Sequence, residues 1–392
     1  MLVGYPAGSS ARSARLAVVG VGFLVFIDGI FSCLANGHIS RPIVQRYGVP
    51  PTQLAYLVDS TASPLCAILP ISSWGPYVMT LLAGIPLLTM LPAAAFVEVA
   101  SANFYAFAAL AMALAAAYWG WGFEPVAARQ TEVETAGSPW PLLLPLLVLI
   151  LGSIVLSWLS GWHRSGEVGL LACFASADIG AAMRNACLMA LLMALASARA
   201  LGLRRILQAL WQGLQAVAPA LGILLLTWMI GRSIDDLGSG ELLARWASAY
   251  LPVALVLPGL FVLCAVTAFA TGSSWGTFAL MIPIGAAVAS GFSPALILPA
   301  VSAVMAGSVF GDHCSPISDT TVISAGASGC EPMQLVLTQL PLAWGAAGAA
   351  LLGFTLLGLG LPLLWCWLVL LCGGALAVLG CQFWSSRAIR TL

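Results

Sequence analysis

The segment GDHCSPISDTT, residues 311–321, places polar side chains between two strongly apolar runs. ILPAVSAVMAGSVF precedes it at 297–310, and VLTQLPLAWGAAGAALLGFTLLGLGL follows at 336–361. The two carboxylates of the segment, Asp312 and Asp319, are costly in hydrocarbon unless protein, water, a proton or a cation compensates their charge. The segment therefore predicts a polar site buried inside a membrane protein.

Composition agrees with this prediction. Of the 392 residues, 61% are hydrophobic and 7% are charged, whereas soluble domains carry about 25% charged residues. The sequence therefore predicts an all-α polytopic membrane protein. The formal net charge is zero and no basic patch is present, which excludes nucleic acid as a partner. The ten cysteines are scattered without a CxxC pair, so we expect no disulfide framework, no zinc site and no cofactor.

Apolar runs of about 20 residues are long enough to cross a bilayer as helices. We expect roughly nine to eleven crossings, because several candidate runs are too short for a full one. The runs 54–71 and 295–310 are interpreted as half-helices or re-entrant arms, and 16–35 as a retained first span rather than a signal peptide. The candidate spans are 16–35, 54–71, 75–92, 95–118, 139–160, 178–198, 207–231, 250–271, 276–291, 295–310, 335–359 and 361–384.

A polar stretch divides the chain. Residues 119–138 contain three glutamates and are predicted to form an extramembrane linker. This linker separates a first transmembrane half, 1–118, from a second, 139–384, which is followed by a cytoplasmic tail at 385–392. Arginines cluster at 199–205 and near the C-terminus, and the positive-inside rule places both clusters in the cytoplasm.

Two short echoes indicate that the halves are related. ISSWGPY at 71–77 resembles GSSWGTF at 272–278, and VDSTASP at 58–64 resembles GDHCSP at 311–316. Secondary transporters often contain two inverted repeats with helices broken near the middle of the bilayer, where the broken ends bind ions or substrate. Proline and glycine in these segments favour such breaks. We therefore predict two repeat-related halves with broken or re-entrant helices.

Carboxylate and hydroxyl oxygens, which are the ligands that hard cations prefer, are frequent in these segments. A carboxylate at this depth is either protonated or neutralised by a cation. Proton and cation would then occupy the site in turn, with Asp59, Asp312 and Asp319 binding a transported Na⁺. In the alternative interpretations, Asp312 and Asp319 only cap helices, and Asp28 pairs with Arg41.

A hydrolytic site is the least favoured alternative. Asp312, His313 and Ser315 are close neighbours in sequence. A catalytic triad needs a base that bridges the nucleophile and the orienting acid, and close neighbours rarely arrange themselves in that way. We therefore expect no enzyme activity.

Three blocks resemble the NhaC-type Na⁺/H⁺ antiporter family: TGSSWGTFALMIPI (271–284), GDHCSPISDTTVIS (311–324) and YLVDSTASPLCAILPISSWG (56–75). The resemblance implies electrochemically driven cation/proton exchange across a bacterial inner membrane. It also implies that the polar segments form the site. The predicted ion- and proton-binding residues are Asp59, Ser60, Thr61, Ser63, Thr271, Ser273, Ser274, Thr277, Asp312, Ser315, Ser318, Asp319 and Thr320, with Asp28 added.

The chain departs from the family in one segment. FIDGIFSCLANGHISRPI (26–43) resembles a family segment with paired aspartates, but Gly29 follows Asp28 here, so one carboxylate is missing. Members of the family also carry several helices before this segment, and few residues precede it in this chain. The resemblance therefore implies either a naturally short member or a truncated one.

Exchange of Na⁺, or another small cation, for H⁺ is the function these observations favour. An organic-acid or amino-acid exchanger coupled to Na⁺ or H⁺ is the alternative, although no arginine lies in the site segments to bind a substrate carboxylate. A transporter fragment that needs a partner chain is the third interpretation. The expected partners are the transported ions and the lipid bilayer, and assembly into a homo-oligomer stays open.

Overall fold

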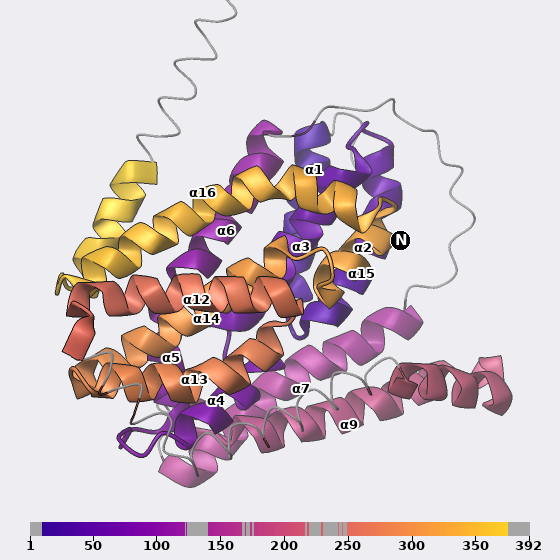
Figure 1. Ribbon diagram of the computed structural model, residues 1–392. Coiled ribbons are helices and arrows are strands. Elements are labelled where there is room, and N and C mark those ends of the chain that lie inside the picture. The colour runs from indigo at the N-terminus through magenta and orange to yellow at the C-terminus, as the bar shows by residue number, and fades with distance from the viewer. Residues whose placement is uncertain are drawn as a thin grey trace, which may run out of the picture.

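The computed structural model shows a bundle of helices, with no strand in the residues it describes (Figure 1). Those residues are 10–121, 123, 140–166, 169, 173–174, 176–215, 218, 229, 242, 245 and 249–374. Most of the predicted linker, the part of the span 207–231 after residue 215 and the predicted tail lie outside them, apart from single residues. The all-helical class predicted from the sequence is confirmed.

Five described helical segments are long and apolar enough to cross a membrane. A sixth crossing results if α5 (Pro92–Ser101) and α6 (Phe104–Trp119), which are bent by 54° at their junction, count as one span. The predicted re-entrant arm at 295–310 is wrong, because its helix continues to Cys314 and reaches full length. The five segments are Leu143–Ser165, Ile179–Ser197, Val253–Thr271, Pro294–Cys314 and Pro332–Gly358.

The first span predicted over 16–35 is interrupted. It forms two helices, α1 (Ala11–Leu24) and α2 (Gly29–Gln45). Asp28 causes the interruption, because its Oδ1 accepts the backbone N–H of Phe31 at 2.9 Å and so caps a new helix at Gly29. A capping carboxylate favours extended backbone at its own position and helix immediately after it.

Helices α1 and α2 together form a re-entrant hairpin. Near the start of α1, Arg15 Nε donates to the carbonyl of Ala117 at 2.8 Å, at the end of α6. Near the start of α3 (Pro51–Ile68), Gln53 Nε2 donates to the neighbouring carbonyl of Ala116 at 3.2 Å. Because only residues 46–50 join α2 to α3, the hairpin begins and returns at the same end of the bundle.

A broken crossing follows the hairpin. Helix α3 ends at Ile68, and α4 (Trp74–Ala83) begins after residues 69–73. Pro64 lies inside α3 without ending it, so the break that its presence suggested comes later in the chain. The first Ser-Ser-Trp-Gly segment starts in this break.

The second half repeats this order. Helices α12 (Val256–Thr271) and α13 (Ser274–Ser290) are joined by Gly272, which has a φ of +64°, and by Ser273, which caps α13. Helix α14 (Ile297–Cys314) follows, and after a break at residues 315–318 the chain continues in the short helix α15 (Asp319–Ser328). The long helix α16 (Pro332–Gly358) takes the place that α5 and α6 have in the first half.

The hairpins α1–α2 and α12–α13 lie at opposite ends of α16. Before α16 begins, Gly329 lies against the Arg41 guanidinium near the end of α2. At the other end of α16, Gly358 lies against Ala254, just before α12. The halves therefore share the same order of elements, but their hairpins enter the bundle from opposite ends. In this order the first Ser-Ser-Trp-Gly segment lies in a broken crossing and the second in a hairpin turn, so this echo does not mark equivalent positions.

Helices α12 and α14 contact each other through their backbones. A Cβ added at Gly307 would lie 3.0 Å from Phe261 Cα, and one added at Gly311 would lie 2.8 Å from Phe269 N. Small residues spaced four apart allow this close approach between membrane helices. The end of α14 that carries Asp312 is therefore held directly against α12.

Helices α7 (Trp140–Ser165) and α9 (Ile179–Ser197) lie side by side along one flank of the bundle (Figure 1). An exposed ion pair joins the end of α7 to the start of α9, with 3.2 Å between Arg164 Nη2 and Asp178 Oδ2. Leu151, Leu188 and Leu192 are among their exposed apolar side chains, as expected for helices that face lipid.

Candidate ion-binding site

The four breaks in the two halves are joined by hydrogen bonds and ring contacts. In the first half, the Ser73 amide donates to the carbonyl of Ile27 at 2.6 Å. In the second half, Ser315 Oγ donates to the carbonyl of Phe269 at 2.9 Å. Between the halves, the rings of Trp74 and Trp275 lie 5.8 Å apart in an edge contact. Broken backbone at membrane depth is tolerated only where protein or water surrounds it, and these contacts supply that surrounding.

Asp59 is fully buried on α3 and faces three neutral side chains of the second half. Thr321 Oγ1 donates to Asp59 Oδ2 at 3.4 Å, and Ser324 Oγ donates to Asp59 Oδ1 at 3.5 Å. Gln339 Nε2 on α16 also donates to Asp59 Oδ2 at 3.4 Å. The sequence did not point to Thr321, Ser324 or Gln339, although the first two belong to the quoted block 311–324.

His313 connects Asp59 to the rest of the site. Its Nε2 lies 3.0 Å from Ser60 Oγ and 3.8 Å from Asp59 Oδ2. Its Nδ1 lies 2.8 Å from the hydroxyl of Tyr105 on α6. The carbonyl of His313 accepts a hydrogen bond from Gln339 Nε2. Helices α3 and α6 thus contact the buried imidazole of His313 on α14, and α16 contacts its backbone carbonyl.

Asp312 occupies a second buried position, in the last turn of α14. Its Oδ2 accepts a hydrogen bond from Ser274 Oγ at 2.9 Å, at the start of α13. Its Oδ1 is buried without a hydrogen-bond partner among the described residues. The interpretation of Asp312 as a helix cap is wrong, because the residue that precedes α15 as its N-cap is Ser318.

Asp28 has structural partners. Besides capping α2, it accepts a hydrogen bond through Oδ2 from Ser73 Oγ at 2.8 Å. Within the described residues it forms no ion pair, so the proposed pair with Arg41 is not present. Asp28 thus ties the two breaks of the first half together.

Asp319 lies exposed in the first turn of α15, and its Oδ1 accepts the amide of Thr320 at 2.7 Å.

The remaining predicted residues differ in burial and in hydrogen-bond partners. Ser63 is buried one turn beyond Asp59, and its hydroxyl has no partner among the described residues. Thr271 is exposed and bonds to the carbonyl of Thr267 in its own helix, so the structure does not bring it to the buried carboxylates. The hydroxyls of Thr61, Thr277 and Ser318 contact atoms of their own helix or its cap, and Ser273 caps α13.

Each buried aspartate could bind a cation with one carboxylate and otherwise neutral oxygen ligands. In the described part of the chain, no three His, Cys, Asp or Glu side chains gather closely enough to hold a metal ion. Asp59, Asp312 and Asp319 therefore do not form one three-carboxylate cluster. Each buried aspartate is instead accompanied by neutral hydroxyls, and Asp59 also by an amide.

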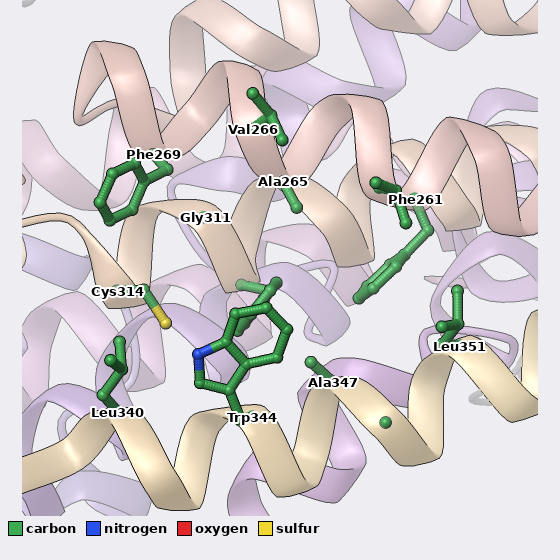
Figure 2. Close-up of a pocket in the computed structure, with 13 residues that line it drawn as sticks. Phe261, Ala265, Val266, Phe269, Gly311, Cys314, Leu340, Trp344, Ala347 and Leu351 are labelled. Atoms are coloured by element: carbon green, nitrogen blue, oxygen red, sulfur yellow. The ribbon is translucent and has the colours of Figure 1, made fainter.

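A pocket of about 420 Å³ lies beside this site, between α12, α14 and α16. Figure 2 shows Trp344 of α16 facing Phe261 and Ala265 of α12, with Gly311 and Cys314 of α14 between the two helices. All of the lining side chains are apolar. The pocket therefore offers no ligand for a cation, although Gly311 is next in sequence to Asp312.

Comparison with known proteins identifies relatives. Residues 65–361 match the Na⁺/H⁺ antiporter family. An uncharacterized protein of Haemophilus influenzae is 35% identical over 370 residues, which cover 88% of this chain and 71% of that protein. A malate-2H⁺/Na⁺-lactate antiporter of Bacillus subtilis is 29% identical over 153 residues, which cover 37% of this chain and 30% of that protein.

One solved structure shares the fold. The YdaH transporter of Alcanivorax borkumensis superimposes with a TM-score of 0.53 at 14% identity. The match covers 90% of this chain and 82% of that one. The likeness shows that the two chains share an overall fold.

Proposed function

Because this chain belongs to the Na⁺/H⁺ antiporter family, we propose that it exchanges Na⁺, or another small cation, for H⁺ across a bacterial inner membrane. The observation that carries the proposal is the burial of two carboxylates, Asp59 inside α3 and Asp312 in the last turn of α14. No arginine among the described residues forms an ion pair with either of them. A transported cation or a proton, which Asp59 can share with His313 at 3.8 Å, then has to neutralise each one.

Competition for the same carboxylates couples the two fluxes. A carboxylate that binds a proton loses its attraction for a cation, and a bound cation disfavours the proton. The hydroxyls around each carboxylate accept either occupant, because a hydroxyl both donates and accepts hydrogen bonds. The protein acts in this scheme as a transporter rather than an enzyme, and assembly into a homo-oligomer is compatible with it.

Proteoliposomes that contain the purified protein test the proposal. An inward Na⁺ gradient should drive H⁺ out of the vesicles, which a fluorescent pH probe in the lumen records. Asp59→Asn and Asp312→Asn should each abolish the signal, because the amide cannot exchange a proton for a cation. Asp178→Asn is the matched control: Asp178 is an exposed helix cap, and Asn caps helices as well as Asp. Exchange at the parent rate in both site variants would contradict the proposal.

A second candidate function is exchange of a small organic anion coupled to Na⁺ or H⁺. The named relative from Bacillus subtilis is a malate-2H⁺/Na⁺-lactate antiporter. Helices α2, α4, α13 and α15 all begin at the breaks, and helix N-termini attract anionic groups. Uptake of radiolabelled lactate or malate into the same proteoliposomes, driven by Na⁺, would favour this candidate over exchange of bare ions.

A further inference from the structure

The two hydroxyl groups that donate to Asp59 lie farther from its carboxylate than hydroxyl donors usually do. Hydroxyl donors normally lie about 2.7–2.8 Å from an acceptor oxygen. Thr321 Oγ1 and Ser324 Oγ lie 3.4 and 3.5 Å from the two carboxylate oxygens of Asp59. All three side chains are fully buried, so bulk water does not complete these contacts.

The observed spacing fits oxygens that share one cation. A cation of the size of Ca²⁺ or Na⁺ binds oxygens at about 2.4 Å. Two such ligands at a right angle lie about 3.4 Å apart, which follows from the same bond length. Both hydroxyl-to-carboxylate distances, 3.4 and 3.5 Å, match this value. A larger ion such as K⁺ needs more widely spaced oxygens.

The side-chain amide of Gln339 can supply a further oxygen ligand if it rotates. Its Nε2 faces two acceptors, Asp59 Oδ2 and the carbonyl of His313, whereas its buried Oε1 has no partner among the described residues. Half a turn about the last side-chain bond exchanges the two amide atoms. After this rotation, Oε1 of Gln339, Oδ2 of Asp59 and the carbonyl oxygen of His313 face one another. Three acceptor oxygens repel each other at this distance, and a cation between them removes that repulsion.

We infer that Asp59, Thr321, Ser324 and Gln339 form the binding site for a dehydrated monovalent cation, with the His313 carbonyl as a further ligand. This inference rests on the proposed cation exchange and names its site and ion class. The site holds one carboxylate, so a monovalent ion is neutralised there. A divalent ion of the same size leaves one positive charge buried without compensation, which is strongly unfavourable. The site therefore selects Na⁺ over K⁺ and Ca²⁺.

Direct binding of ²²Na⁺ to the purified full chain in detergent tests this inference. Thr321→Val, Ser324→Ala and Gln339→Leu should each weaken Na⁺ binding by roughly 10–100-fold, as loss of a supporting group does at other metal sites. Excess unlabelled Na⁺ should displace ²²Na⁺ from the parent protein, whereas K⁺ and Ca²⁺ should not. Thr321→Ser keeps the hydroxyl and should bind Na⁺ nearly as the parent does, which separates loss of a ligand from a folding defect.

Thr338→Val is the matched control. Thr338 is next to Gln339, but it is only half-buried and its hydroxyl bonds to the carbonyls of Gln334 and Leu335 in its own helix. Its substitution should leave Na⁺ affinity unchanged. Parent affinity in all three site variants would overturn the inference, as would displacement by Ca²⁺ at equal concentration. If Asp312→Asn still abolished exchange in that case, the proposed function would stand without this site. A parent protein that neither binds ²²Na⁺ nor moves protons would overturn both.

Discussion

Gly307→Ala tests whether α12 and α14 really meet through their backbones. The added methyl would lie 2.9 Å from the carbonyl carbon of Phe261 and 3.0 Å from its Cα. Carbon atoms in contact prefer about 3.5–4.0 Å, so the helices would have to separate by roughly half an ångström or more at this point. Neither backbone can rotate away as a side chain would. Overpacking of this kind costs about 1–3 kcal/mol, and we expect a value near the upper end.

Gly259→Ala is the matched control, because Gly259 is exposed on α12 and a Cβ there meets nothing within 4 Å. Alanine is the better helix former by about 1 kcal/mol, so this variant should be as stable as the parent or slightly more stable. The assay is the temperature at which half of each purified variant is lost from the monodisperse peak after heating in detergent. If Gly307→Ala melts at or above the temperature of Gly259→Ala, the close contact between α12 and α14 does not exist.

Three further substitutions probe other contacts by the same melting assay. Asp28→Ala removes the cap of α2 and the acceptor of Ser73, and should cost about 0.5–2 kcal/mol; Asp28→Asn should recover most of it, and equal melting of both variants would refute the capping role. Tyr105→Phe leaves a buried nitrogen of His313 without its partner and should cost about 1–3 kcal/mol; an unchanged melting temperature would contradict this contact. Arg164→Ala breaks an exposed ion pair and should cost less than about 1 kcal/mol; a larger loss would show that the pair holds α7 to α9.

Local sequence patterns predicted much of the fold. The charge-poor composition predicted membrane helices, and the Ser-Pro of 315–316 stands at a break that the structure contains, whereas the break at Asp28 falls inside a span predicted as continuous. Pro64 was a poorer guide, since it lies inside α3. Proline removes one backbone donor, and neighbouring groups in a packed bundle tolerate that loss. The helix therefore ends where its packing ends rather than at the proline.

The candidate site could be predicted only in part. Asp59 and Asp312 were evident, because a carboxylate in an apolar run is conspicuous. Gln339 and Tyr105 were not, since an amide or a phenol within a long apolar helix resembles a core residue. Their roles depend on contacts 280 residues from Asp59 and 208 residues from His313 along the chain. No local sequence pattern predicts contacts between residues so far apart, and the two repeated segments did not show which residues of the two halves would meet.

Asp59 is far from its partners along the chain, so it is synthesised long before them. Thr321, Ser324 and Gln339 follow Asp59 by 262, 265 and 280 residues. At the usual rates of translation, α3 exists for roughly 15–60 s before the last of them leaves the ribosome. Throughout that interval the nascent chain contains a carboxylate without its final neighbours. The surroundings of Asp59 are therefore complete only after the start of α16 has been synthesised.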